Sequence, residues 1–106
     1  MDAQLKKGVL EVCVLSAIEN EESYGYKIIS DLEPYISISE STLYPILRRL
    51  EQSGAVKSRS VEYHGRLRRY FSITQIGREK LSYFIEMMSD FERIKSFLLR
   101  GKKHDV

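Results

Sequence analysis

The sequence predicts a mostly α-helical fold with a β-hairpin, namely a winged helix-turn-helix followed by one long C-terminal dimerisation helix. Three observations support this prediction. Residues 39–52 form an amphipathic segment with a basic outer face, two strand-like runs joined by a glycine turn come next, and an apolar-striped segment follows them. We expect residues 1–74 to form the winged helix-turn-helix, residues 75–101 the dimerisation helix, and residues 102–106 a disordered tail.

The composition is that of one small globular domain. Of the 106 residues, 30% are charged and 42% are hydrophobic, which is an ordinary mixture for such domains. No apolar run approaches the roughly 18 residues that cross a membrane, and no secretory signal follows the N-terminal lysines. The single cysteine, Cys13, has no partner for an internal disulfide, which fits a reducing compartment. We therefore expect a cytoplasmic protein without membrane association.

The first helix is expected from Leu5 to Ile18. Its apolar run covers about 14 residues, which is longer than a typical strand. Because apolar residues lie nearly all round this segment, the small core of a 106-residue chain is insufficient to cover it. We expect part of this helix, including Leu5 and Val9, to face a partner subunit.

A second helix is expected from Tyr24 to Glu33, capped by Ser23 and ended by Pro34. Gly25 in its first turn costs up to about 1 kcal/mol relative to alanine, so we expect it to permit a close approach to the backbone. One side of the helix is expected to carry Tyr24, Ile28, Leu32 and Tyr35. The short connection at residues 35–38 then leads into the next helix, as in a helix-turn-helix.

The third helix, expected over residues 39–53, has two different faces. Its apolar stripe has the spacing i, i+3, i+4, i+7 and consists of Leu43, Ile46, Leu47 and Leu50. Its outer face consists of Ser41, Tyr44, Pro45, Arg48 and Gln52, with Arg49 at the margin. Hydroxyls, a phenol and arginines suit contacts with phosphates and base edges, although a merely solvated face is the alternative. Pro45 lacks a backbone donor, which indicates either a functional feature or a tolerated proline early in the helix.

Gly54 is expected to end the third helix in a left-handed conformation, and a β-hairpin is expected after it. The strands are expected at residues 55–63 and 67–74, with the tip at residues 64–66. Residues 48–80 contain nine basic and three acidic residues, whereas residues 19–40 contain six acidic residues and one lysine. The hairpin arginines therefore predict a wing that contacts phosphates, although chance clustering on solvated strands is the alternative. These arginines are Arg66, Arg68 and Arg69.

The last helix is expected to begin after Thr74 as its N-cap and to end at Gly101. It carries a coiled-coil-like apolar stripe that Lys95 interrupts once. Because no later element covers this stripe, we expect a second copy of the chain to do so. The expected dimer interface consists of Leu5, Val9, Leu81, Phe84, Met88, Phe91 and Leu98.

Together these blocks resemble the PadR-like transcriptional regulators. The resemblance rests on residues 24–26, on residues 42–54 with the run Thr42-Leu43-Tyr44-Pro45, and on residues 65–74 with the Gly-Arg-x-Arg hairpin. It implies a homodimeric bacterial repressor of the short branch of the family, with a winged helix-turn-helix and one C-terminal helix. Some short members bind flat hydrophobic molecules at the dimer centre through a tryptophan of the last helix, and this chain has no tryptophan.

Candidate residues for an effector pocket are Phe84, Met87, Met88 and Phe91, and packing within the core or dimer interface is the alternative role for them. We expect a sequence-specific DNA-binding regulator, most simply a repressor on a palindromic double-stranded operator with half-sites about 34–36 Å apart. The expected DNA-contacting residues are Ser39, Ser41, Thr42, Tyr44, Pro45, Arg48, Arg49, Arg66 and Arg68.

The sequence also bears on two other classes of function. A winged helix that binds another protein without contacting DNA is the alternative, and the arginine-rich hairpin argues against it. An enzyme is not expected, because the sequence has no metal-ligand spacing of His and Cys, no phosphate-binding glycine loop and no pairing of a nucleophile with a base. No cofactor and no metal are expected.

Overall fold

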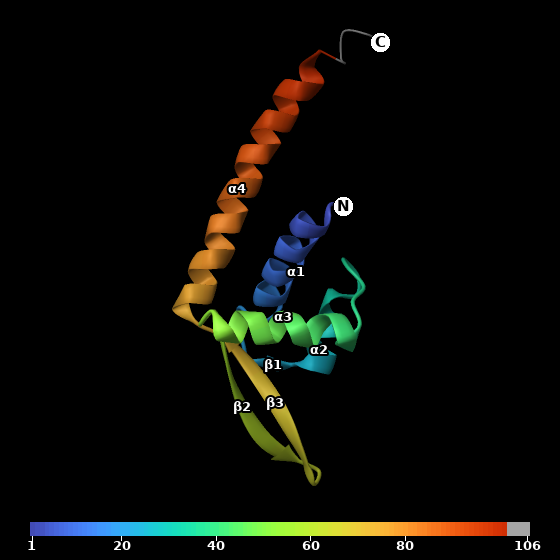
Figure 1. The fold of residues 1–106 in the computed structure, drawn as a ribbon, viewed down its shortest axis with the longest axis vertical. Coiled ribbons are helices and arrows are strands. Elements are labelled where there is room, and N and C mark those ends of the chain that lie inside the picture. The colour runs from blue at the N-terminus through green and yellow to red at the C-terminus, as the bar shows by residue number, and fades with distance from the viewer. Residues whose placement is uncertain (102–106) are drawn as a thin grey trace.

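The computed structural model describes residues 1–101 and confirms a mostly α-helical winged helix-turn-helix with a β-hairpin (Figure 1). The expected tail, residues 102–106, lies outside the described residues. The elements in order are α1 (Ala3–Ala17), β1 (Ser23–Tyr24), α2 (Gly25–Leu32), α3 (Glu40–Gln52), β2 (Val56–Tyr63), β3 (Arg66–Ile73) and α4 (Gln75–Arg100). In Figure 1 the hairpin of β2 and β3 extends to one side of α3, and α1 and α4 extend to the other.

The hydrophobic core lies where α1, α2 and α3 meet the base of the hairpin. The apolar stripe of α3 is buried as expected, with Leu43, Ile46, Leu47 and Leu50 each no more than 3% exposed. Phe71 and Ile73 of β3 close the core from the sheet. The amphipathic spacing of α3 therefore fixes which of its faces remains exposed.

The first helix begins earlier than expected, because the Asp2 side chain accepts a hydrogen bond from the Leu5 backbone N–H at 3.2 Å and caps it. Its second half is buried in the core, with Val14 and Leu15 fully inside. Its first turns are exposed, and Leu5 keeps 48% of its surface. Within one chain, the N-terminal half of this helix therefore leaves apolar surface exposed, whereas its C-terminal half does not.

The expectation that Ser23 caps the second helix is wrong. Ser23 and Tyr24 form the short strand β1, which pairs antiparallel with β3 at Phe71 and Tyr70. Tyr24 then takes the N-cap position of α2 in an extended conformation, without a side-chain hydrogen bond to the helix. Pairing with β3 therefore sets the backbone at residue 23, and a two-residue strand is too short to show the alternation that predicts strands.

Two glycines and a histidine set the turns on either side of β2. Gly54 has φ +82°, and the backbone N–H of Ala55 donates to the Leu50 carbonyl at 2.9 Å, which confirms the left-handed end of α3. At the hairpin tip His64 and Gly65 have φ of +50° and +78°, as a two-residue turn requires. Arg66 is therefore the first residue of β3, paired with Tyr63, rather than part of the tip.

Helix α4 begins as expected, because the Thr74 hydroxyl accepts a hydrogen bond from the Gly77 N–H at 3.2 Å. Only its start packs on the rest of the chain, where Leu81 is buried. From residue 91 onward every side chain of α4 is exposed, so the helix projects beyond the other elements (Figure 1). Among residues 1–101, no helix combines the length and the apolar character needed to cross a lipid bilayer.

Candidate nucleic-acid interface

The outer face of α3 carries most of the residues that the sequence singled out. Ser41, Thr42, Tyr44 and Arg48 are exposed, and Pro45 is half-buried. Pro45 lies beyond the first turn of α3, which begins at Glu40, so it is deeper in the helix than an early-helix proline. Because proline has no N–H, the carbonyl of Ser41 has no helical donor four residues ahead.

Three hydroxyls gather at the start of α3. The Ser39 hydroxyl lies 2.9 Å from the Ser41 hydroxyl and 3.2 Å from the Thr42 hydroxyl. Ser39 occupies the N-cap position, but its side chain makes no hydrogen bond to the backbone of α3. The helix start therefore presents exposed hydroxyls that both donate and accept hydrogen bonds.

Tyr44 is packed against the first residue of α2. A β-carbon at Gly25 would lie 2.9 Å from the ring carbon Cζ of Tyr44, which is closer than real β-carbons come to their neighbours. The close approach that the sequence predicted at Gly25 is thus confirmed, and the approaching group is a side chain of the next helix. Tyr44 still keeps 38% of its surface, so it is both fixed and accessible.

A groove of about 730 Å³ lies between the hairpin and the starts of α2 and α3. It brings Tyr44 of α3 together with Arg66 and Arg68 of β3. The groove is also lined by Tyr24, Gly25, Tyr26, Glu40, Tyr63, His64, Leu67 and Arg69. Residues that are more than twenty positions apart in the sequence thus share one aromatic and basic surface.

Carboxylates partner only some of the basic side chains on this side of the molecule. The Nη2 atom of Arg69 lies 2.6 Å from Glu51, and the Nε atom of Arg59 lies 2.9 Å from Glu22. The hydrogen bond from Arg59 lowers the pKa of Glu22, so this pair stays charged above the acidic range. The positive charge that the hairpin leaves unpaired is therefore smaller than its number of arginines indicates.

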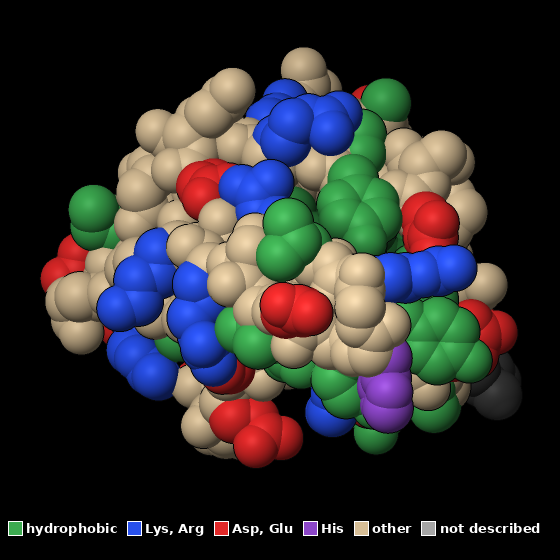
Figure 2. Space-filling view, turned by 90° about the horizontal axis from the view of Figure 1, so that it is seen from below, with side chains coloured by type: hydrophobic (Ala, Val, Ile, Leu, Met, Phe, Trp, Pro, Cys, Tyr) green, Lys and Arg blue, Asp and Glu red, His purple; other side chains and the backbone are tan. Residues whose placement is uncertain are grey.

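Other basic side chains have no such partner. Within residues 1–101, no carboxylate lies within ion-pair distance of Arg48, Arg66 or Arg68. A hydrogen bond with Tyr70 raises the pKa of Arg68, which therefore remains a cation. Figure 2 views this side of the molecule and shows Lys and Arg side chains in several groups with acidic and hydrophobic side chains between them.

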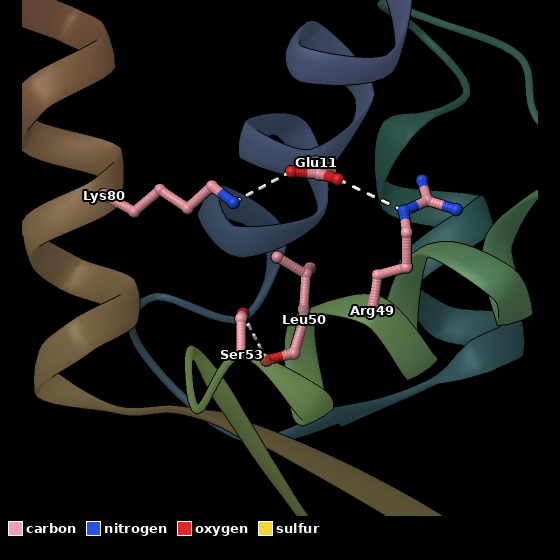
Figure 3. A network of polar contacts seen from close by, with 5 residues as sticks. All are labelled: Glu11, Arg49, Leu50, Ser53 and Lys80. Carbon is pink, nitrogen blue, oxygen red and sulfur yellow. Dashed lines mark hydrogen bonds and ion pairs between the residues drawn. The ribbon is translucent and has the colours of Figure 1, made fainter.

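Arg49 lies on a different side of α3 from Arg48. Its Nε donates to Glu11 of α1 at 3.3 Å, and the same carboxylate accepts from Lys80 of α4 at 2.9 Å (Figure 3). Burial raises the pKa of Glu11, but the hydrogen bonds and positive charges of Lys80 and Arg49 together lower it by more. The resulting pKa is below the ordinary value. Three helices are thus joined through one carboxylate, whose role no pattern in the sequence indicates.

The expected dimer residues differ in how much surface they offer. Met88, Phe91 and Leu98 of α4 are 53%, 54% and 65% exposed, whereas Leu81 is buried by its own chain. Val9 and Phe84 are half-buried, and Phe84 lies near Gly8 of α1. The four residues considered for an effector pocket follow helical spacing along one face of α4: Phe84, Met87, Met88 and Phe91.

Among the described residues, no group of three His, Cys, Asp or Glu side chains is placed to hold a metal ion.

Comparison with known proteins agrees with this geometry. Residues 14–83 match the model of the transcriptional regulator PadR-like family. A PadR-like transcriptional regulator from Bacillus cereus is 32% identical, with a TM-score of 0.78 and coverage of 93% of this chain and 99% of that chain. A PadR family regulator from Eggerthella lenta is 30% identical, with a TM-score of 0.81 and coverage of 92% and 87%.

The transcriptional regulator Rv3488 of Mycobacterium tuberculosis is 28% identical over 102 residues, which cover 95% of this chain and 92% of that protein. The similarity therefore extends over the helix-turn-helix, the wing and most of α4. The family model spans both α3 and the arginine hairpin, the elements that build the groove. By its fold and by these matches, the chain belongs to the PadR-like family of transcriptional regulators.

Proposed function

We propose that this chain is a homodimeric repressor that binds a palindromic double-stranded DNA site, with α3 in the major groove and the β2–β3 wing beside it. The observation that carries the proposal is the distribution of carboxylates around the basic residues. Arg48, Arg66 and Arg68 have no carboxylate partner in residues 1–101, whereas Arg59 and Arg69 pair with Glu22 and Glu51. Unpaired arginines on an exposed surface suit phosphates and guanine edges.

The roles differ between the two elements. Ser41, Thr42, Tyr44 and Arg48 lie on the exposed face of α3 and are proposed to reach base edges and phosphates in the major groove. Arg66 and Arg68 on the wing are proposed to bind flanking phosphates. Arg49 has a different role in this proposal, because its bond to Glu11 fixes α3 against α1.

The dimer is proposed to form through α4 and the exposed start of α1. The support is the apolar surface that one chain leaves uncovered at Leu5, Met88, Phe91 and Leu98. A two-fold symmetric dimer contacts two half-sites about one helical turn apart, at about 34–36 Å. Repression then follows where such a site overlaps a promoter.

A small hydrophobic effector that releases the repressor is part of the proposal. Its pocket would be built by Phe84, Met87, Met88 and Phe91 from both copies of α4. The helical spacing of these four residues on one face supports a shared lining. Since the chain has no tryptophan, stacking on the effector would rest on the two phenylalanines.

The test is a fluorescence-anisotropy titration of the purified full chain against a labelled duplex chosen by selection from random DNA. We expect Arg48→Ala to weaken binding by about tenfold or more, as loss of one base or phosphate contact does. Arg59→Ala is the matched control, because Glu22 occupies its guanidinium. No binding of the unmodified chain at low salt would support a protein-interaction module instead.

A further inference from the structure

We propose that Tyr24 and Tyr63 form an aromatic clamp that holds the guanidinium of Arg68 in place to receive one phosphate of the DNA backbone. The inference rests on the proposed function and deepens it. It assigns two positioning residues that act on DNA binding through Arg68, and it makes Arg68 a preformed receptor for a phosphodiester.

The clamp is built by three strands. The guanidinium carbon of Arg68 lies 4.0 Å from the ring centre of Tyr24 and 3.9 Å from that of Tyr63. Tyr24 belongs to β1, Arg68 to the central strand β3, and Tyr63 to β2. Both distances are well inside the range at which a cation is attracted by an aromatic face.

The register of the sheet produces this arrangement. Arg68 pairs with Val61, and Tyr63 pairs with Arg66, so Arg68 and Tyr63 are diagonal neighbours on one face of the sheet. On the other side of β3, Tyr24 pairs with Tyr70, two residues from Arg68. Each tyrosine therefore reaches Arg68 from a different neighbouring strand.

The clamp positions a cation without neutralising it. Arg59 and Arg69 of the same hairpin are held by carboxylates, which neutralise the positive charges of the two arginines. Arg68 is held instead by uncharged tyrosines, through the rings of Tyr24 and Tyr63 and a hydrogen bond with Tyr70. No carboxylate among the described residues pairs with it. The planar guanidinium presents a fork of N–H donors at its edge, which matches two oxygens of a phosphate.

The location supports a nucleic-acid phosphate as the ligand. Arg68 lines the same groove as Tyr44 of α3 and Arg66 of the wing, so a phosphate there lies beside the DNA-reading helix. Holding the side chain before binding removes the cost of ordering it in the complex. We therefore expect the clamp to strengthen DNA binding by about three- to tenfold.

The experiment is a double-mutant cycle in DNA-binding titrations with the selected duplex. Tyr63→Leu removes one ring at an exposed position, since Tyr63 is 47% exposed, and leaves the backbone pairing of the hairpin in place. We expect it to weaken binding by about three- to tenfold, and we expect Tyr63→Phe, which keeps the ring, to bind like the unmodified chain. In an Arg68→Ala background, Tyr63→Leu is expected to cause no further loss.

A second measurement follows the clamp without DNA. Relaxation of the Arg68 side-chain Nε–Hε signal in the free protein is expected to show a more ordered group than that of Arg66, and Tyr63→Leu should remove the difference. Two results would overturn the clamp while the proposed function stands: full affinity in Tyr63→Leu, or an equal loss with and without Arg68. Absence of duplex binding by the unmodified chain would overturn both, so the two failures are distinguishable.

Discussion

The ring of Tyr44 lies across Gly25, with Cζ of Tyr44 2.9 Å from the position that a β-carbon on residue 25 would occupy. This relationship joins the first residue of α2 to the outer face of α3. Gly25 does not have a positive φ, so its backbone conformation does not require a glycine. A glycine is needed there because the Tyr44 side chain occupies the space of a β-carbon. The start of α2 thereby sets the position of an exposed residue on the helix proposed to enter the DNA groove.

Gly25→Ala is expected to fold normally but bind DNA more weakly. The added methyl group would displace the end of the Tyr44 side chain, which is flexible enough to move at little cost in stability. A misplaced Tyr44 would lose its contact with DNA, so we expect affinity to fall by about tenfold, the effect of about 1.4 kcal/mol. Gly8→Ala in α1 is the control, because its β-carbon finds only Phe84 at 3.9 Å.

Near-normal DNA affinity of Gly25→Ala, with thermal unfolding unchanged, would show that the position of Tyr44 does not matter for binding. Thermal unfolding and anisotropy titrations on the same samples separate the two effects.

Gly77→Ala is expected to destabilise the fold strongly. A β-carbon there would collide with the backbone carbonyl of Ala55 and lie 2.7 Å from Cγ1 of Ile73. Because a backbone carbonyl cannot swing aside as a side chain does, we expect a loss of about 1–3 kcal/mol in the free energy of unfolding. Urea denaturation measures it, and Gly101→Ala serves as control since its β-carbon meets nothing within 4 Å. Equal stability of both variants would contradict the tight contact between α4 and residue 55.

Glu11→Gln is expected to lower stability at neutral pH by about 1–2 kcal/mol, the contribution of hydrogen bonds to a charged group. The carboxylate joins Arg49 and Lys80, and its pKa in the folded state lies below the ordinary value of 4.5. A lowered pKa means that the contribution is fully present above about pH 4.5 and is lost as the pH falls through the folded value. The difference between the two proteins should therefore shrink in acid.

Urea denaturation at pH 7 and below pH 4 tests this pH dependence, with Glu79→Gln on the exposed side of α4 as control. A stability difference that is the same at both pH values would show that the charge of Glu11 is not what stabilises the junction of α1, α3 and α4.

Met88→Lys is expected to yield monomers. Met88 is 53% exposed on the apolar stripe of α4, and a lysine there would place an unpaired charge in the proposed interface, which is costly when buried. Glu86→Lys, on the opposite side of the helix, is expected to leave the dimer intact. Sedimentation velocity distinguishes the two masses. A Met88→Lys protein that sediments as a dimer would place the interface elsewhere.

Local sequence signals predicted the fold well. The i, i+3, i+4, i+7 spacing in α3, the positive φ at Gly54 and the Thr74 cap all agree with the structure, because each depends on neighbours in the chain. The expectation that Tyr35 belongs to the apolar side of α2 is wrong, since Tyr35 is 88% exposed. The helix ends at Leu32, so helical spacing no longer describes residue 35.

The candidate site was predictable only in part, because charge pairing depends on distant segments. Glu51 and Arg69 are 18 residues apart in the sequence, and Glu22 and Arg59 are 37 residues apart. Only the folded chain shows which arginines are neutralised. The role of Arg49 depends on Glu11, a carboxylate inside an otherwise apolar segment. Likewise, β1 forms because it pairs with the edge of β3, and two residues are too few to show a pattern that predicts this pairing.

The most direct test of the central claim is selection of bound sequences from a pool of random double-stranded DNA with the purified full chain. We expect enrichment of an inverted repeat whose half-sites are about 34–36 Å apart, as a two-fold symmetric winged-helix dimer requires. Recovery of sequences no different from those of a protein-free control, at low salt, would contradict DNA recognition by α3 and the wing.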